Sequence, residues 1–442
     1  MVEMVASFKM IITALSAAVA ACGMSATPAP VPLSAVEMCE DMNSWVDWTL
    51  ATHPDVSWSS DPDMLRQRAE VSCREFDGAY DQRGAWFALS ELNPTLNDAH
   101  AGLRLPDAAF EDWRSGGGSP FPVPVEVRAS GVFVTEAGRN SQLMSGDRIV
   151  EINGRSTESL LSALLPRMRG ETEALRRRVL SLKFAEALWT LTGDQGAHVV
   201  TVQRGDARIA GIRLDANQAA GTAPAPFELQ FRDDIAILVV DTFSMHYLSE
   251  FDLFLTDAFE SIADQGADTL IIDLRNNGGG ARDLSDRLMI HLTSQRYTPI
   301  SAVTARITPE NQALVPGSEL GQVISTPFAQ WVQPPEALPH RFEGEAVILI
   351  GPGTYSQAVV FAATAQDFGV ARLAGLPTEG AANQSGQVQR FVLPNSGLTV
   401  QSPIYIFTRA SGEQGREPLR PDLEVQGQGE AQLAALIDRL SD

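Results

Sequence analysis

Short apolar runs that alternate with helical segments constrain the fold of the C-terminal half more than any other feature of the sequence. Three such runs lie at 235–241, 268–274 and 346–350. Continuous apolar runs of this length are typical of strands that are buried on both faces of a sheet. The alternation predicts an α/β fold with a mostly parallel sheet covered by helices. The helices are expected at 249–264, 281–293 and 357–367.

The 442 residues are enough for roughly two or three domains. The beginning of the chain has helical periodicity, and the glycine- and proline-rich stretch Ser115–Pro122 indicates a linker after it. Short β-rich runs on both sides of a long helical segment indicate a second domain before the parallel sheet. The expected divisions are an N-terminal helical domain at 35–114, a second domain at 120–215, a core at 226–427 and a closing helix at 428–442.

The first residues have the pattern of a targeting segment. Lys9 precedes the apolar run 10–21, which is too short to span a bilayer and ends in small residues. The stretch Val19–Cys22 resembles a lipobox, in which the cysteine is lipidated and becomes the mature N-terminus. The alternative is an ordinary secretory signal that is cleaved near Ala21 or Ala26.

Both interpretations of this segment predict export. We expect a signal peptide at 1–22, a tether at 23–34 and a protein at the periplasmic face of a bacterial membrane, which it contacts only through a lipid on Cys22. Cys39 and Cys73 then remain as an even pair in an oxidising compartment, which predicts a disulfide. Such a bridge would contribute about 3 kcal/mol in the chain-entropy model. The alternative is two buried free thiols.

The charge of the chain argues against several kinds of partner. The formal net charge is −22, and the only lysines are Lys9 and Lys183. Binding of phosphate groups needs clustered cations, so we expect neither nucleic acid nor an anionic membrane surface as a partner. The histidines are scattered and the cysteines are already assigned, so we expect no metal site and no cofactor.

Two turns that follow predicted parallel strands carry the candidate chemistry. One contains Gly278 and Gly279, and the other contains Ser356 and Gln357. Open α/β sheets place their sites at the carboxyl ends of strands. Successive glycines let backbone N–H groups converge on a developing oxyanion, and a serine at a helix N-terminus gains a positive field. A serine before a helix is more often a cap, but the two turns together indicate a nucleophile with its oxyanion donors.

The same segments resemble the C-terminal-processing (tail-specific) serine peptidases. The resemblance rests on Asp273–Gly280, Gly353–Ala358 and Gln366–Gly375. It implies a crotonase-like (ClpP/crotonase-type) catalytic core and hydrolysis of peptide bonds through an acyl-enzyme on Ser356. It also implies that the backbone N–H groups of the two turns form the oxyanion hole, and that the substrates are peptides or unfolded proteins.

A second resemblance concerns the domain at 120–215. The stretch Ser145–Arg155 looks like the strand–turn signature of PDZ domains, which the tail-specific peptidases usually carry as an insertion. Such domains bind extended chain ends at a sheet edge. The usual carboxylate-binding loop is not evident here, so the resemblance implies a PDZ-like fold more strongly than it implies capture of C-termini.

The sequence departs from most of that family at the catalytic base. Where the family has a catalytic lysine, this chain has Ala381. The stretch Leu96–His100 instead matches the pattern of a histidine-using branch that is similar to tricorn core proteases and interphotoreceptor retinoid-binding modules. His100 is therefore the candidate general base for Ser356. The alternative is a histidine at a helix end that pairs with Asp98.

A histidine base needs a group that orients it. The resemblance implies a glutamate shortly before the closing segment of the family, where Glu417 and Glu413 are available. Each of these is otherwise a solvated loop charge. His246 is a second, less favoured histidine for the cleft.

The preferred function is thus an exported serine-type peptidase that uses histidine in place of lysine. The alternative is a catalytically inactive lipoprotein that binds peptides or hydrophobic ligands and keeps the same fold, as the retinoid-binding relatives do. A periplasmic adaptor that uses only its PDZ-like domain is a third interpretation.

Overall fold

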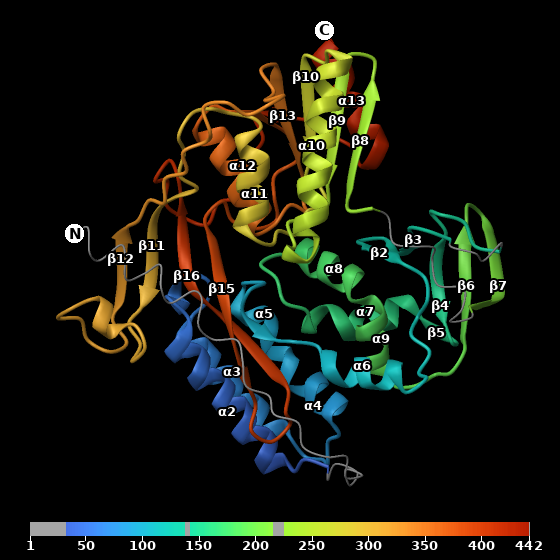
Figure 1. Cartoon of the computed structure of the whole chain (residues 1–442). Coiled ribbons are helices and arrows are strands. Elements are labelled where there is room, and N and C mark those ends of the chain that lie inside the picture. The colour runs from blue at the N-terminus through green and yellow to red at the C-terminus, as the bar shows by residue number, and fades with distance from the viewer. Residues whose placement is uncertain (1–31, 138–141, 215–224, 442) are drawn as a thin grey trace.

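The computed structural model describes residues 32–137, 142–214 and 225–441 (Figure 1). The predicted signal peptide at 1–22, with Cys22, and nearly all of the tether lie outside the described residues. In the described ranges, no helix is both long enough and apolar enough to cross a membrane.

A six-stranded, mostly parallel sheet forms the centre of the C-terminal half, as the alternation of apolar runs predicts. Only the edge strand β8 runs antiparallel to its neighbour β9, and the other pairs are parallel. The α/β class is therefore confirmed. In spatial order the strands are β17 (Leu423–Glu424), β14 (Arg372–Gly375), β13 (Glu345–Ile350), β10 (Thr269–Asp273), β9 (Ile235–Val240) and β8 (Phe227–Arg232).

Helices cover both faces of this sheet (Figure 1). Side chains alternate between the two faces of a strand, so Leu238 packs with the helices of one face while Ile237 packs against the other side. The first face carries α10 (Leu248–Gln265), α11 (Arg282–Ile290) and α12 (Gln357–Asp367), and the second carries α13 (Gly429–Ser441).

A second sheet, which the sequence pattern did not predict, joins segments that are far apart in the sequence. Its centre is a long antiparallel hairpin of β15 (Gln384–Val392) and β16 (Thr399–Arg409). The short strand β1 (Gly102–Leu103) pairs with β16, so a segment near the N-terminus lies beside the C-terminal hairpin. The remaining strands, β11 (Ile300–Arg306) and β12 (Val323–Pro327), extend the sheet from the edge of β16 that lies opposite β15.

The N-terminal part is helical, as predicted, and a disulfide joins Cys39 on α2 to Cys73 on α3. The helices are α2 (Ala35–Thr52), α3 (Pro62–Glu75), α4 (Gln82–Leu89), α5 (Asn93–Leu96) and α6 (Asp107–Ser115), with short 3-10 turns η1 (Val56–Trp58) and η2 (Ser90–Leu92).

Between α6 and β8 lies a module of strands and helices that we call the middle module, residues 123–214. Its sheet has the order β2-β3-β4-β6-β7, with β5 beside β4. The predicted long helical segment is divided, since the turn η3 contains Pro166 and Gly170 has φ +141°. The strands are β2 (Val125–Arg128), β3 (Gly131–Val134), β4 (Arg148–Ile152), β5 (Arg155–Ser156), β6 (His198–Arg204) and β7 (Ala207–Leu214); the helical elements are α7 (Thr157–Leu164), η3 (Leu165–Arg167), α8 (Glu173–Leu182) and α9 (Phe184–Thr192).

One buried core runs through the N-terminal helices, the middle module and the β15–β16 hairpin. It contains Trp45 from α2, Ile149 from β4 and Val400 from β16. The parallel sheet with its helices has separate cores on its two faces. The packing therefore links the N-terminal helices to the end of the chain and brings loops from distant parts of the sequence to one place.

Candidate active site

Ser356 occupies a sharp turn between strand β13 and helix α12. Its backbone has φ 52° and ψ −124°, a conformation that residues other than glycine rarely adopt. Its side chain makes no capping hydrogen bond to α12, so the alternative of a simple helix cap does not describe it. The strained turn instead directs the hydroxyl away from the helix, as at a nucleophile elbow.

Gly279 makes this turn sterically feasible. It has φ +96°, and a Cβ built on it would lie 2.7 Å from Cβ of Ser356 and 2.8 Å from the backbone nitrogen of Gln357. Such distances are far shorter than van der Waals contact, so only glycine fits. The two predicted turns therefore meet, and they meet directly at Ser356.

His100 lies against Ser356 from the loop between α5 and β1. Its Nε2 atom is 3.1 Å from the Ser356 hydroxyl oxygen, although the two residues are 256 positions apart in the sequence. The ring is stacked on that of Tyr355, with centroids 5.1 Å apart. Gln401 on β16 donates to the His100 carbonyl at 3.0 Å, which fixes the loop. The His100 side chain is 16% exposed, so it is enclosed but open to one side.

The other ring nitrogen of His100 contacts Ser385, which links it to Asp98. The distance from Nδ1 to the Ser385 hydroxyl is 3.0 Å, and Ser385 donates to Oδ1 of Asp98 at 2.9 Å. Because the serine proton is directed to the carboxylate, the His100 Nδ1 proton is directed to the serine oxygen. That tautomer leaves Nε2 unprotonated and able to accept the proton of Ser356.

Asp98 is completely buried and stays ionised. Burial tends to raise the pKa of its carboxyl, but the contact with His53 and the charge of His100 outweigh it and lower the pKa to about 2. Nε2 of His53 lies 3.6 Å from Oδ2 of Asp98, and Nδ1 of the same ring accepts the N–H of Asp55 at 3.2 Å. His53 therefore presents its Nε2 proton to the carboxylate.

The pKa of His100 is lowered from its ordinary value. Burial is the main cause, and the nearby charge of Arg169 acts in the same direction, while Asp98 opposes both. His100 is consequently neutral at neutral pH. A neutral imidazole with a free Nε2 is the form that a general base requires.

The middle module contributes three residues that hold the two site loops. Arg169 donates to the carbonyl of Ala99 at 2.8 Å, and Glu171 accepts the N–H of Ala99 at 3.3 Å. Glu171 also accepts the Tyr355 hydroxyl at 2.9 Å, while the same hydroxyl lies 3.3 Å from Nδ1 of His100. Burial and the charge of Asp98 raise the pKa of Glu171 to about 7.

The middle module also contacts the glycine turn. Arg178 on α8 donates to the carbonyl of Asn276 at 3.1 Å, next to that turn.

The predicted oxyanion donors differ in whether their backbone N–H groups already donate hydrogen bonds to other described residues. The N–H of Gly279 is taken by the side chain of Asn277 at 2.8 Å, and that side chain is anchored on the Val240 carbonyl at 3.0 Å. Gly278 donates its N–H to no other described residue, and Gln357 stands at the first position of α12, where a backbone N–H has no partner within the helix. Gly278 and Gln357 are therefore the donors that an oxyanion can use.

Neither predicted glutamate reaches the histidine. The carboxylate of Glu413 pairs with Arg409, and the exposed Glu417 contributes its backbone carbonyl to the N–H of Ala382 at 2.8 Å. Within the described chain, the His100 ring is bonded to Ser356, Ser385 and Tyr355 rather than to a glutamate. The carboxylate that orients the His100 ring is that of Asp98. The sequence analysis named Asp98 only as a pairing partner of His100 in the alternative without catalysis.

The remaining sequence candidates lie elsewhere. His246 is exposed in a turn before α10 and stacks edge-on with Tyr247. Ala381, where the related peptidases have lysine, is buried and forms an isolated antiparallel β-bridge with Pro418. Lys183 pairs with Glu186 in the middle module. No described lysine therefore lies at the site, and no described cluster of side chains has the composition of a metal site.

Sequence reasoning missed four residues of this arrangement, namely Ser385, His53, Tyr355 and Glu171. Ser385 lies on a strand that was not predicted, and no motif surrounds His53, which follows α2, or Glu171, which lies between η3 and α8. Tyr355 directly precedes Ser356 within the recognised motif, so its position was the one available signal.

Comparison with known proteins relates part of the chain to a peptidase family. Residues 234–425, which include Ser356 and every strand of the parallel sheet except β8, match peptidase family S41. No curated protein sequence matches the chain.

Solved structures with the same fold cover nearly the whole chain. Mature CPAF complexed with lactacystin aligns with a TM-score of 0.64 at 14% identity, over 92% of this chain and 97% of that one. The photosystem II D1 C-terminal processing protease gives a TM-score of 0.51 at 14% identity, over 88% and 93%. A peptidase of Parabacteroides merdae, described as putative, gives 0.50 at 13% identity, over 92% and 96%. At these identities the likeness concerns the fold.

Proposed function

Residues 234–425 match peptidase family S41, and on that premise we propose that the chain, a serine-type peptidase, hydrolyses peptide bonds with Ser356 as nucleophile and His100 as general base. The observation that carries the proposal is the distance of 3.1 Å between Nε2 of His100 and the hydroxyl oxygen of Ser356. A nucleophile and its base must lie within hydrogen-bond reach. The substrates in this proposal are peptides or unfolded proteins.

The directions of the hydrogen bonds define the proton transfers. As the Ser356 oxygen attacks the scissile carbonyl carbon, its proton passes to Nε2 of His100. The Nδ1–H group of the imidazolium that forms continues to donate a hydrogen bond to the Ser385 oxygen. Ser385 in turn donates a hydrogen bond to the Asp98 carboxylate. The C–N bond then breaks, and the leaving amine takes the proton from Nε2. The product is an ester on Ser356.

Water completes the cycle by the same route in reverse. Nε2 of His100 accepts a proton from the water as its oxygen attacks the ester carbonyl. When the C–O bond to Ser356 breaks, the serine oxygen recovers that proton from His100. The N–H groups of Gly278 and Gln357 stabilise the oxyanion in both steps, and the N-terminus of α12 adds a favourable field.

We assign the sheet with α10–α13 to a crotonase-like catalytic core and the middle module to an inserted PDZ-like domain. The antiparallel sheet of the middle module and its helices support the second assignment. Helix α8 packs on the edge strand β2, and Ser181 accepts the N–H of Val127 at 2.8 Å. An extended peptide end would need that N–H, so this edge is filled by the protein itself in the present conformation.

We further propose that the protein is exported and lipidated at Cys22. The disulfide between Cys39 and Cys73 supports an oxidising compartment. Mass spectrometry of the mature protein should detect a lipidated N-terminal Cys22, and a Cys22→Ala variant should leave the membrane fraction. A mature N-terminus that begins at another residue and carries no lipid would contradict the anchor.

Turnover of an unfolded protein substrate tests the catalytic proposal. The parent should cleave it, Ser356→Ala and His100→Ala should not, and Ser411→Ala, an exposed serine away from the site, should match the parent. Equal turnover by Ser356→Ala would contradict the nucleophile. Ligand binding by a parent that cleaves nothing would instead support the inactive lipoprotein.

A further inference from the structure

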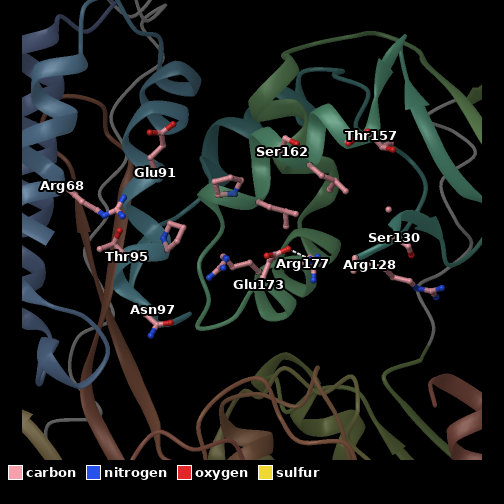
Figure 2. A pocket seen from close by; sticks show the side chains of 18 of the residues that line it. Arg68, Glu91, Thr95, Asn97, Arg128, Ser130, Thr157, Ser162, Glu173 and Arg177 are labelled. Atoms are coloured by element: carbon pink, nitrogen blue, oxygen red, sulfur yellow. Dashed lines mark hydrogen bonds and ion pairs between the residues drawn. The ribbon is translucent and has the colours of Figure 1, made fainter. Parts of the chain in front are cut away.

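A large cavity separates the N-terminal helices from the middle module (Figure 2). Its volume is about 1120 Å³. One wall comes from α3 and the segment around α5, and the other comes from α7, η3, α8 and the β2–β3 turn. Neither Ser356 nor His100 lines it, so it is separate from the active site.

The cavity has an excess of positive charge that the composition of the chain does not predict. The whole chain has a formal net charge of −22. The side chains of Arg68 and Arg148 line the cavity, are exposed, and form no hydrogen bond or ion pair with any described residue. In Figure 2 the Arg68 side chain extends from the α3 wall toward the opening between the walls.

The other charges of the cavity do not cancel this excess. Arg176 donates to the carbonyl of Gly170 at 3.0 Å, a contact that leaves its charge uncompensated. Glu158 is the lining carboxylate without a cation partner among the described residues. The remaining lining charges form neutral pairs: Arg177 with Glu173, Glu91 with Arg167, and Arg128 with Glu126.

Apolar and neutral polar side chains complete the lining, the polar ones including Thr95 and Ser162 (Figure 2). Met64, Leu161 and Leu165 offer apolar surface in the same cavity as the arginines. Fixed cations together with apolar surface suit an extended polypeptide with carboxylate side chains, because the methylene groups of such side chains can pack while the carboxylates pair with guanidinium groups. A longer polyanion such as nucleic acid would be repelled by the strongly acidic remainder of the protein.

The loop that carries His100 begins at a residue that lines the cavity. Asn97 lines the cavity, and the next residue, Asp98, holds the Ser385–His100 chain. Asn97 itself has a left-handed conformation with φ 50° that ends α5. A chain segment that binds in the cavity therefore lies beside the wall that carries the catalytic histidine.

We propose that this cavity is an exosite that binds an acidic segment of the polypeptide substrate, with Arg68 and Arg148 as its principal cationic contacts. The identification of the bound segment with substrate rests on the proposed peptidase function. The binding of an acidic chain does not rest on the peptidase function, since it requires only the cavity.

Binding is tested in the full-length Ser356→Ala variant, which prevents cleavage of the probe. The probe is a fluorescent peptide of alternating glutamate and serine, and its comparator has glutamine in place of glutamate. Fluorescence anisotropy should show binding of the acidic peptide that weakens with salt and exceeds that of the glutamine peptide. Replacing both arginines, R68Q/R148Q, should weaken binding of the acidic peptide about tenfold.

The matched control is R66Q/R208Q, which removes the same charge from arginines outside the cavity that are paired with Asp63 and Glu151. It should bind the acidic peptide as the Ser356→Ala parent does. Equal binding of the two peptides, or equal weakening by R68Q/R148Q and R66Q/R208Q, would overturn the exosite.

The kinetic part of the test uses enzyme with Ser356 intact. A cleavable peptide with an acidic extension should have a lower KM than the same peptide without it, and R68Q/R148Q should reduce that advantage about tenfold. Acidic-peptide binding together with an extension that has no effect on KM would overturn the link to substrate. Absence of turnover with intact acidic binding would count against the peptidase proposal alone.

Discussion

Ser385 donates its hydroxyl proton to Asp98 across 2.9 Å, although 287 positions separate the two residues in the sequence. The oxygen of Ser385 also accepts a hydrogen bond from the Nδ1–H group of His100. A carboxylate that lies 3.7 Å from the imidazole nitrogen thereby orients the ring through a hydroxyl group. The β15–β16 hairpin, which supplies Ser385, is thus part of the proposed catalytic arrangement and not only of the scaffold.

Replacement of Ser385 by alanine should lower kcat by roughly 10- to 100-fold, the cost of one hydrogen bond to a group that becomes charged. Tyr355 still contacts Nδ1, so activity should not vanish. Ser385→Thr keeps the hydroxyl and should recover most of the rate. Steady-state kinetics with one peptide substrate measures both variants, and an unchanged kcat in Ser385→Ala would show that the serine does not position His100.

The glycine turn offers a prediction with an internal control. Gly279→Ala places a methyl group 2.7 Å from Cβ of Ser356, and the resulting displacement of the nucleophile should lower kcat about 100-fold or more. At Gly278 a Cβ would meet nothing within 4 Å, and alanine retains the N–H. Gly278→Ala should therefore keep most of the activity. Similar kcat values for the two variants would contradict the close approach of the turns.

The pH dependence of kcat/KM should report the lowered pKa of His100. The base works only when neutral, so activity falls as the pH drops through the His100 pKa. That pKa lies below the ordinary 6.5 because of burial and Arg169, so the acid limb should lie below pH 6.5. Asp98→Asn removes the charge that raises the pKa, and its weaker activity should show a limb at still lower pH. A parent limb above pH 6.5 would contradict this environment.

Asp98 should also make the fold sensitive to acid. Its pKa is lowered from 3.8 to about 2 in the folded protein. A lowered carboxyl pKa contributes stability that is fully present above the unfolded value and is lost as the pH falls through the folded value. The free energy of unfolding should therefore decrease between about pH 4 and pH 2, and less steeply in Asp98→Asn. Urea unfolding across this range measures the two slopes, and equal slopes would contradict the prediction.

The sequence predicts β9, β10 and β13 of the parallel sheet because each is a largely apolar run that can be recognised without knowledge of its neighbours. It does not predict the β15–β16 hairpin. Beyond Gly386 every residue of β15 is exposed or half-buried, and half of these side chains are polar, so its apolar signal is weak. Its place in the fold comes from pairing with β16 and, through β16, with β1.

The same contrast holds within the site. Ser356 and His100 lie in motifs, and the structure brings them within hydrogen-bond distance. The orienting group was expected at Glu417 or Glu413, but these side chains point to solvent or to Arg409, and Asp98 is directed to His100 through Ser385. Ser385, His53 and Glu171 reach the site through long-range packing, which leaves no local pattern in the sequence.

The rate at which a fluorophosphonate labels Ser356 tests the central claim most directly, since it depends on the nucleophile and its base and on no particular substrate. Intact-mass and peptide mapping should place one adduct on Ser356 of the parent, none on Ser356→Ala, and one formed at least about 100-fold more slowly on His100→Ala. Labelling of His100→Ala at the parent rate would contradict the account that Ser356 is activated by His100.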